Sequence, residues 1–355
     1  MTLESWGWRP EWDFQFDAFR AEGRMPARVV QEHRERYIIV TAEGEVPAVI
    51  PGKTRDAAES RADFPAVGDW VAASRTDDGS LCVIHAVLPR KSVFARKAPG
   101  AVTDLQVIAA NVDVLFLVTG LDGDFNPRRV ERYVTLAWES GAKPVVILNK
   151  ADICADVSEA VAAIESVAFG VDVLPVSALA GDGVDALRAF FQAGHTIALV
   201  GSSGVGKSTI VNALMGEERM RTSAVREDDS RGRHTTTHRE LMLVPGGGIL
   251  VDTPGMRELQ LWASEESLEK SFEDVARFAE QCRFRDCTHK GEPGCAVLAA
   301  VESGALGQAR LDSYFKLGRE LQYLERKEDG RLQSLERAKW KAIHKQIKEI
   351  YKHKR

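Results

Sequence analysis

Hydrophobic positions change their spacing twice along the chain, and the first region is typical of short strands. Between about residues 25 and 97, β-branched and aromatic runs alternate with turn signals at Gly44, Pro51-Gly52 and Asp78-Gly79. The runs cover 29–30, 37–40, 46–50, 70–73 and 82–87. Five short strands predict a small β-barrel, and we favour an OB type, which often binds oligonucleotides. Because periodicity does not separate the two, an SH3-like barrel stays open as the alternative.

The second region, from 103 to 262, alternates near-continuous apolar runs with amphipathic stretches. Such apolar runs are typical of parallel strands that are buried on both faces of a sheet. We predict helices over 128–140, 157–169 and 183–192 between them. The expected strands are 112–118, 144–148, 171–176, 196–200 and 248–251. The pattern predicts a doubly wound α/β domain.

The third region, from residue 263 onward, has a helical pattern that starts with an acidic amphipathic helix over 265–280. We therefore predict a multidomain chain with three parts. Residues 1–102 form an N-terminal strap plus the OB-type barrel, 103–262 the α/β domain, and 263–355 a helical domain with a basic tail. We expect the aromatic residues of the strap to be packed rather than to stack on bases; they are Trp6, Trp8, Trp12 and Phe14.

Composition and charge indicate the general class of protein and its expected location. The 355 residues carry a net charge of −5, with 44% hydrophobic and 28% charged residues, as in ordinary globular proteins. The first 25 residues lack the apolar core of a secretory signal, and no apolar run is long enough for a membrane helix. We therefore expect a cytoplasmic protein without a membrane partner. A monomer is the default expectation for its oligomeric state. The last 17 residues hold seven Lys or Arg and one Glu; this tail is either a solvated helix end or a basic helix against RNA phosphates.

Residues 201–208 have the complete pattern of a phosphate-binding loop, G-x-x-x-x-G-K-S. This segment follows the apolar run 196–200 and precedes a predicted helix, the context that this motif requires. Backbone N–H groups would surround phosphate oxygens, Lys207 would reach the β and γ phosphates and act in catalysis, and Ser208 would bind Mg²⁺. The expected nucleotide contacts are Gly201, Ser202, Ser203, Gly204, Val205, Gly206, Lys207, Ser208 and Thr209.

A second motif, Asp252-Thr-Pro-Gly255, follows an apolar run and completes a nucleoside triphosphatase pattern. The Asp252 carboxylate can hold Mg²⁺ through water, and the Gly255 N–H can reach the γ phosphate. The polar segment between the two motifs carries His234 and Thr236. We expect Thr236, with its neighbours as alternatives, to complete the Mg²⁺ shell. His234 is the nearest candidate to position the attacking water, and the alternative is a solvated or RNA-contacting loop residue.

The motif Asn149-Lys150-Ala151-Asp152 selects the base. The Asp152 carboxylate can accept two N–H bonds from guanine, Asn149 can bond the acceptor side, and the Lys150 stem can pack on the purine ring. Ser177-Ala178 ends the next predicted strand and can offer a backbone N–H to the guanine oxygen. Both base motifs precede the phosphate loop, whereas an ordinary small GTPase has them after it. The sequence therefore predicts a circularly permuted GTPase.

Three cysteines and one histidine lie within fourteen residues, in the pattern C-x₄-C-x-H-x₅-C. Three thiolates and an imidazole form the ligand set of a closed structural zinc site, with no position left for catalysis. The expected ligands are Cys282, Cys287, His289 and Cys295. The other two cysteines, Cys82 and Cys154, are interpreted as ordinary core residues.

The barrel, the permuted motif order and the cysteine cluster together resemble the bacterial ribosome small subunit-dependent GTPase A family. The resemblance runs from about residue 25 to at least 324. It implies binding of the 30S ribosomal subunit and its 16S rRNA late in subunit assembly, GTP hydrolysis to GDP stimulated by that subunit, and release after hydrolysis.

Two other interpretations remain open. One is a permuted GTPase that acts on a different ribonucleoprotein or on a large-subunit intermediate. The other is a non-catalytic RNA-binding module, which the intact Lys207, Ser208 and Asp252 disfavour because degenerate sites usually lose such residues.

Overall fold

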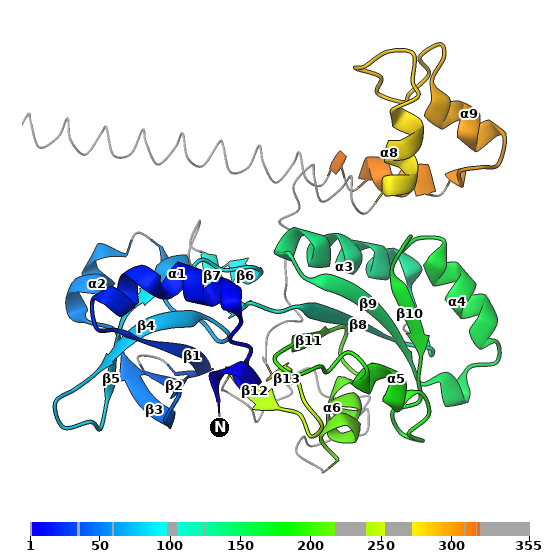
Figure 1. Cartoon of the computed structure of the whole chain (residues 1–355). Coiled ribbons are helices and arrows are strands. Elements are labelled where there is room, and N and C mark those ends of the chain that lie inside the picture. The colour runs from blue at the N-terminus through cyan, green and yellow to red at the C-terminus, as the bar shows by residue number, and fades with distance from the viewer. Residues whose placement is uncertain are drawn as a thin grey trace, which may run out of the picture. The chain divides into compact units, whose positions relative to one another are not determined.

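The computed structural model describes residues 2–33, 36–58, 60–97, 105–123, 125–216, 239–252, 272–308, 310–316 and 318–319. The chain divides into two compact units, residues 1–260 and 261–355 (Figure 1). The first unit contains the barrel and the α/β sheet, and the second contains the cysteine cluster. None of the helices in these described ranges has the length and apolar character needed to cross a membrane.

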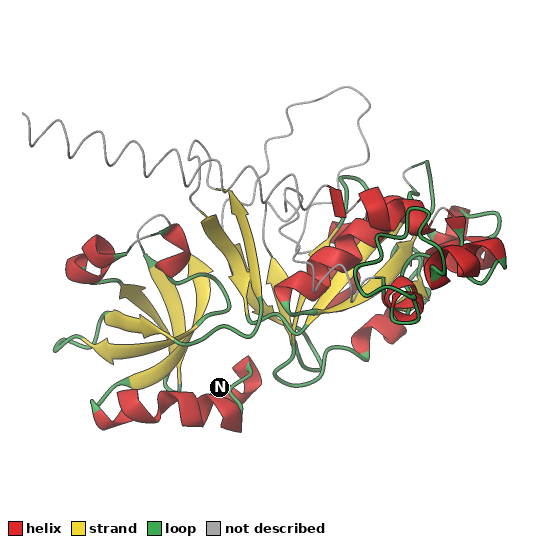
Figure 2. Ribbon diagram, turned by 90° about the horizontal axis from the view of Figure 1, so that it is seen from above, coloured by secondary structure: helices red, strands yellow, loops and turns green. Residues whose placement is uncertain are grey.

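Five strands close into a barrel near the N-terminus, and the OB-type prediction is confirmed. Strand β3 runs parallel to β5, while the neighbouring pairs β1–β2, β2–β3 and β4–β5 are antiparallel, and β1–β4 closes the ring. The strands curve around a common interior (Figure 2), and Ile39, Val71 and Ile84 belong to its apolar core. The strands are β1 (Met25–Glu32), β2 (Tyr37–Thr41), β3 (Gly44–Val49), β4 (Trp70–Arg75) and β5 (Cys82–Val87).

Short helical elements accompany the barrel: η1 (Leu3–Trp6), α1 (Pro10–Ala21), α2 (Gly52–Ala57) and η2 (Arg61–Asp63). The predicted packed strap is confirmed for Trp6 and Trp12, which are buried, and for Trp8, whose ring lies edge-on 4.8 Å from Trp70. For Phe14 the prediction is wrong, because its side chain is 84% exposed. Residues four apart share a helix face, so Trp12 and Phe16 face the core, and Phe14 between them faces solvent.

The α/β sheet has the order β10-β9-β8-β11-β13-β12. Its first five strands are parallel, and β12 runs antiparallel to β13. Every residue of β8 and β11 is buried, as expected for strands covered on both faces. The strands are β8 (Val114–Gly120), β9 (Lys143–Asn149), β10 (Asp172–Pro175), β11 (Thr196–Val200), β12 (Arg239–Leu243) and β13 (Ile249–Asp252).

Helices cover both faces of this sheet (Figure 1). One apolar cluster includes side chains of α3 and α4, and a second includes α5 and α6. Helix α4 is shorter than the predicted 157–169, because a turn follows Glu165 while Ala168 stays buried and prolongs the apolar spacing. The helices are α3 (Pro127–Ser140), η3 (Ala151–Ile153), α4 (Val157–Glu165), α5 (Val184–Arg188) and α6 (Lys207–Met215).

The barrel and the α/β sheet are joined by strand pairing that the sequence analysis missed. Strand β1 pairs with β12 through Gln31 opposite Glu240 and Glu32 opposite Arg239. A hairpin of β6 (Val93–Lys97) and β7 (Leu105–Ala110) lies between the two parts in sequence. The predicted boundary between residues 102 and 103 falls within 98–104, outside the described residues.

A buried arginine reinforces this junction. The Arg28 guanidinium of β1 donates to the carbonyl oxygens of Trp6 and Gly68 and, over 2.8 Å, to the hydroxyl of Thr196 at the start of β11. Burial lowers the pKa of Arg28 to about 10. These bonds satisfy a charged group that would otherwise be costly to bury.

The second unit contains α8 (Glu273–Ala279) and α9 (Ala296–Glu302). Its core includes Phe272, Val275, Val297 and Leu311. Helix α8 covers the C-terminal half of the predicted helix over 265–280, and residues 253–271 lie outside the described part of the chain. The basic tail from 339 onward also lies outside it.

Candidate functional site

The nucleotide motifs gather at one edge of the α/β sheet. The phosphate loop follows β11, Asp252 ends β13, Asn149 ends β9, and Ser177 lies just beyond β10. These four strands are parallel, so their carboxyl ends lie at the same edge, the usual ligand site of such sheets. The structure therefore brings together motifs as far apart in sequence as Asn149 and Asp252.

The phosphate loop turns tightly from β11 into α6, which begins at Lys207. Three of its glycines, Gly201, Gly204 and Gly206, have positive φ angles, which glycine adopts at little cost. The Lys207 ammonium donates to the carbonyl oxygens of Gly201 at 2.7 Å and Ser202 at 2.5 Å. Lys207 therefore lies folded over its own loop, with Ser208 and Thr209 in the first turn of α6.

Asn149 connects the phosphate loop with the segment after β10. Its Nδ2 donates to the Val205 carbonyl at 2.8 Å, and its Oδ1 accepts from the Ala178 N–H at 3.1 Å. The residue is only 3% exposed. A Cβ on Gly206 would lie 2.2 Å from Asn149 Nδ2, so glycine at 206 is what permits this contact. Asn149 thus has a structural task as well as any contact with the base.

The remaining base-side residues surround Asn149. Lys150 has a left-handed backbone with φ of 66°, and Asp152 lies exposed in η3. Ser177 is buried and accepts a hydrogen bond from the Ala180 N–H on its hydroxyl. Since Asn149 engages the Ala178 N–H, that donor serves to position the loop.

The structure adds Asp122, which the sequence analysis missed. Its Oδ2 lies 2.5 Å from Nζ of Lys150. The sequence held a usable signal, because Asp122 closely follows a predicted parallel strand and therefore lies at the same edge as the other motifs.

Asp252 lies beside a second carboxylate. Burial, and then the charge of Glu240 opposite it on β12, raise the pKa of Asp252 to about 6. Glu240 was also missed, since β12 itself was not predicted. A divalent cation would favour two ionised carboxylates at this position.

Three predicted residues lie outside the described part of the chain: Gly255, His234 and Thr236. Their predicted roles at the γ phosphate, at the attacking water and at Mg²⁺ stay predictions.

The four predicted zinc ligands come together in the second unit, with their ligand atoms within 4.8 Å of one another. The sulfur atoms of Cys282 and Cys295 are 3.9 Å apart, and His289 Nδ1 lies 3.6 and 3.5 Å from them. Tetrahedral zinc requires edges of about 3.8 Å between sulfurs and about 3.6 Å between sulfur and nitrogen. Burial lowers the pKa of His289, which favours the neutral ligand form. The donor set and the spacing therefore suit a structural metal ion.

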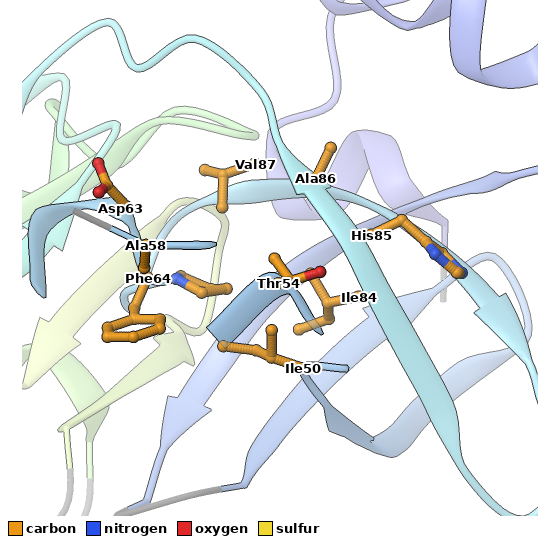
Figure 3. A pocket seen from close by; sticks show the side chains of 10 residues that line it. Ile50, Thr54, Ala58, Asp63, Phe64, Ile84, His85, Ala86 and Val87 are labelled. Atoms are coloured by element: carbon orange, nitrogen blue, oxygen red, sulfur yellow. The ribbon is translucent and has the colours of Figure 1, made fainter. Parts of the chain in front are cut away.

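A separate cavity of about 230 Å³ lies in the barrel (Figure 3). Ile50, Phe64 and Ile84 form apolar parts of its wall, and His85 lies at its side. Among the residues that the structure describes, none of the predicted nucleotide or metal ligands lines it.

The sheet order, the phosphate loop on β11 and the base motifs that precede it define a circularly permuted P-loop GTPase. The sequence model of the family described as RsgA GTPase matches residues 87–262. The "Small ribosomal subunit biogenesis GTPase RsgA 1" of Oceanobacillus iheyensis is 47% identical over 323 residues, 91% of this chain and 92% of that protein. The chain therefore belongs to the RsgA GTPase family, whose members hydrolyse GTP.

Other similar proteins agree with this assignment. The "Small ribosomal subunit biogenesis GTPase RsgA" of Opitutus terrae is 46% identical over 353 residues, 97% of this chain and 96% of that protein. The crystal structure of YjeQ from Thermotoga maritima has a TM-score of 0.64 and 28% identity, and covers 84% of this chain and 98% of that one. The structure titled "YloQ, a circularly permuted GTPase" has a TM-score of 0.62 at 24% identity, covering 84% and 95%, and supports the fold.

Proposed function

We propose that this protein is a GTPase that acts in the biogenesis of the small ribosomal subunit. The observation that carries the proposal is that relatives of this name match nearly the whole chain. It is supported by the described part of the nucleotide edge, in which Asn149 joins the phosphate loop and the base loop. The finer proposal is that the protein binds the 30S subunit through its 16S rRNA, and that the subunit stimulates hydrolysis. A protein with this role would be located in the cytoplasm.

The chemistry at the nucleotide edge follows from the positions of the charged groups. Backbone N–H groups of the phosphate loop and the Lys207 ammonium would stabilise charge on the β and γ phosphates, which is the main catalytic contribution in phosphoryl transfer. Ser208 and Asp252 would hold Mg²⁺, which neutralises phosphate charge, and Thr236 would complete its shell. Gly255 would bond the γ phosphate, and His234 would position water.

The residues that would select the base lie at the same edge of the sheet, in the segments that follow β9 and β10. Asp152 is exposed at the end of this edge and can accept both N–H groups of guanine, which adenine does not offer in that arrangement. Lys150 would cover the purine ring, while Ser177 and Ala178 shape the loop around the guanine oxygen. The described geometry supports this assignment through the contacts of Asn149 with both loops.

The cysteine cluster would hold one structural zinc ion. The support is that all four ligand atoms lie within 4.8 Å of one another, and that the distances among Cys282, His289 and Cys295 are close to the edges of a tetrahedral site. The purified protein is therefore expected to contain one equivalent of zinc by elemental analysis, and a Cys287→Ser variant is expected to contain much less. Equal zinc contents would contradict the ligand assignment.

Steady-state GTP hydrolysis, measured with the protein alone and with purified 30S, 50S or 70S particles, tests the partner. We expect strong stimulation by 30S and little by 50S. Stimulation by 50S alone would assign a different particle and leave the GTPase activity untouched. Hydrolysis that no particle accelerates would remove the ribosomal subunit as the activator.

A further inference from the structure

An ion pair joins the ends of two neighbouring strands at the nucleotide edge. Strands β8 and β9 pair in parallel as far as Gly120 and Asn149. Just beyond them, Lys150 Nζ lies 2.5 Å from Asp122 Oδ2, and each side chain is 27% exposed. The Leu121 N–H donates to the Asn149 carbonyl over 2.8 Å, so the backbone next to Asp122 is attached to the base motif itself.

The backbone fixes both partners of this pair. Lys150 has a left-handed conformation, and its carbonyl accepts from the Ile153 N–H at 3.2 Å. The Asp122 carbonyl accepts from the Phe125 N–H at 3.0 Å. A Cβ on Gly120 would lie 2.9 Å from Asp122 Oδ1, so glycine at this position leaves room for the carboxylate. The fold therefore directs the carboxylate toward the lysine of the base motif.

A lysine that packs on a flat ring must give up much of its rotamer freedom. If this freedom is already restricted before the ligand arrives, less free energy is lost on binding. A carboxylate that holds the ammonium while the methylene stem stays accessible provides this restriction. Asp122 meets that requirement, because it contacts the end of the Lys150 side chain from the segment that follows β8.

We propose that Asp122 is a positioning residue for guanine nucleotides. It holds the Lys150 ammonium so that the methylene stem forms a preformed wall for the purine ring of GTP and GDP. This inference rests on the proposed function of the Asn149 to Asp152 motif in base recognition. It assigns to Asp122 an effect on nucleotide affinity that acts only through Lys150.

The test is a double-mutant cycle on the dissociation constant of a fluorescent GDP analogue, measured with the full chain and Mg²⁺. Asp122→Asn keeps the shape of the side chain and removes its charge. We expect it to weaken binding by about threefold to tenfold, the size of effect expected from losing one partly buried ion pair. In a Lys150→Ala background the same substitution is expected to change the constant by less than about 1.5-fold, because the contact is already absent.

A matched control lies at the other end of the same strand. Lys143, the first residue of β9, pairs with Asp172 at 2.7 Å, and both side chains are about half exposed. Asp172→Asn therefore removes a lysine–aspartate pair of the same unit far along the strand from the nucleotide edge. We expect it to leave GDP affinity unchanged. Thermal unfolding of each variant separates a loss of affinity from a loss of stability.

The other outcomes separate a failure of the positioning role from a failure of the base-site assignment. If Lys150→Ala weakens GDP binding and Asp122→Asn does not, the positioning role is wrong and the base-site assignment stands. If Asp122→Asn weakens binding equally in both backgrounds, Asp122 acts independently of Lys150 and the positioning role is again wrong. If Lys150→Ala leaves affinity unchanged, both the base-site assignment and the inference fall.

Discussion

The two sides of the nucleotide edge are built differently. On the base side, polar groups bind one another: Asn149 bonds two loops, and Lys150 pairs with Asp122. On the phosphate side, Lys207 bonds carbonyl groups of its own loop, and Asp252 lies opposite another carboxylate, Glu240. The polar groups on the base side therefore stabilise one another. On the phosphate side, the two carboxylates suit a bound cation, and the Lys207 ammonium suits a polyphosphate.

A buried carboxylate with a structural task shows the contrast. Asp69 is fully buried in the barrel, and Arg90 contacts both of its oxygens at 2.8 Å. Asp252 instead has a neighbour of like charge. Proteins keep such unfavourable arrangements mainly at functional sites, where a ligand supplies the missing charge.

The largest effect is expected from Lys207→Ala on the phosphate side. It removes a positive charge from the transferred phosphate, and the loss of one such stabilising group lowers kcat by about 10²- to 10³-fold. The unfolding temperature should change little, since the two bonds described for the Lys207 ammonium go to carbonyl groups within its own loop. Steady-state hydrolysis and thermal unfolding measure the two quantities, and a kcat within tenfold of the wild type would contradict the assigned role.

Asp152→Asn should affect the base side alone. The amide places a donor against the guanine N–H groups, so GTP affinity is expected to fall on the order of a hundredfold or more. Xanthine carries an acceptor oxygen where guanine has its amino group, and XTP should bind the variant better than GTP. Competition binding with both nucleotides measures this exchange. A variant that still prefers GTP would show that Asp152 does not contact the base.

Asn149→Ala tests whether the two sides are coupled. It leaves the Val205 carbonyl and the Ala178 N–H without their partner, at a cost of about 1–3 kcal/mol for each buried polar group. We therefore expect both a lower free energy of unfolding in urea and a GDP affinity reduced by roughly tenfold or more. Lower affinity at unchanged stability would mean that Asn149 serves the ligand only.

The smallest effect is the pH dependence of Asp252→Asn in the protein free of Mg²⁺ and nucleotide. The pKa of Asp252 is raised from 3.8 to about 6, so ionisation of this carboxyl destabilises the folded state. The free energy of unfolding of the wild type therefore falls as pH rises from about 4 to about 6. The asparagine variant should match the wild type at pH 4 or below and unfold a few degrees higher near pH 7. Asp69→Asn, which breaks the pair with Arg90, should lower the unfolding temperature instead. A pH-independent difference for Asp252→Asn would contradict the cause assigned to the shift.

The predicted elements succeeded where the signal is local. Strands β8, β9 and β11 are continuous apolar runs, and their burial on both faces follows directly from composition. The missed strands β6, β7 and β12 contain polar or charged residues among their apolar ones. Strand β12 pairs with β13 and with β1 of the barrel, and β1 is far away in sequence. Phe14 shows the limit of counting aromatic residues, because only its place on the turn of α1 exposes it.

The sequence by itself determined the phosphate loop, the base motif and the cysteine pattern, because each of these works through residues close together in the chain. Their common edge also followed, since parallel strands place their carboxyl ends together. Only the tertiary structure decided which side chains meet across strands: Asp122 with Lys150, Asn149 with Val205, and Glu240 with Asp252. These contacts depend on strand register and on the absence of a Cβ at Gly120 and Gly206. The position of Asp122 after a strand indicates the edge at which it lies, but the spacing of residues within a motif does not show which side chain it meets.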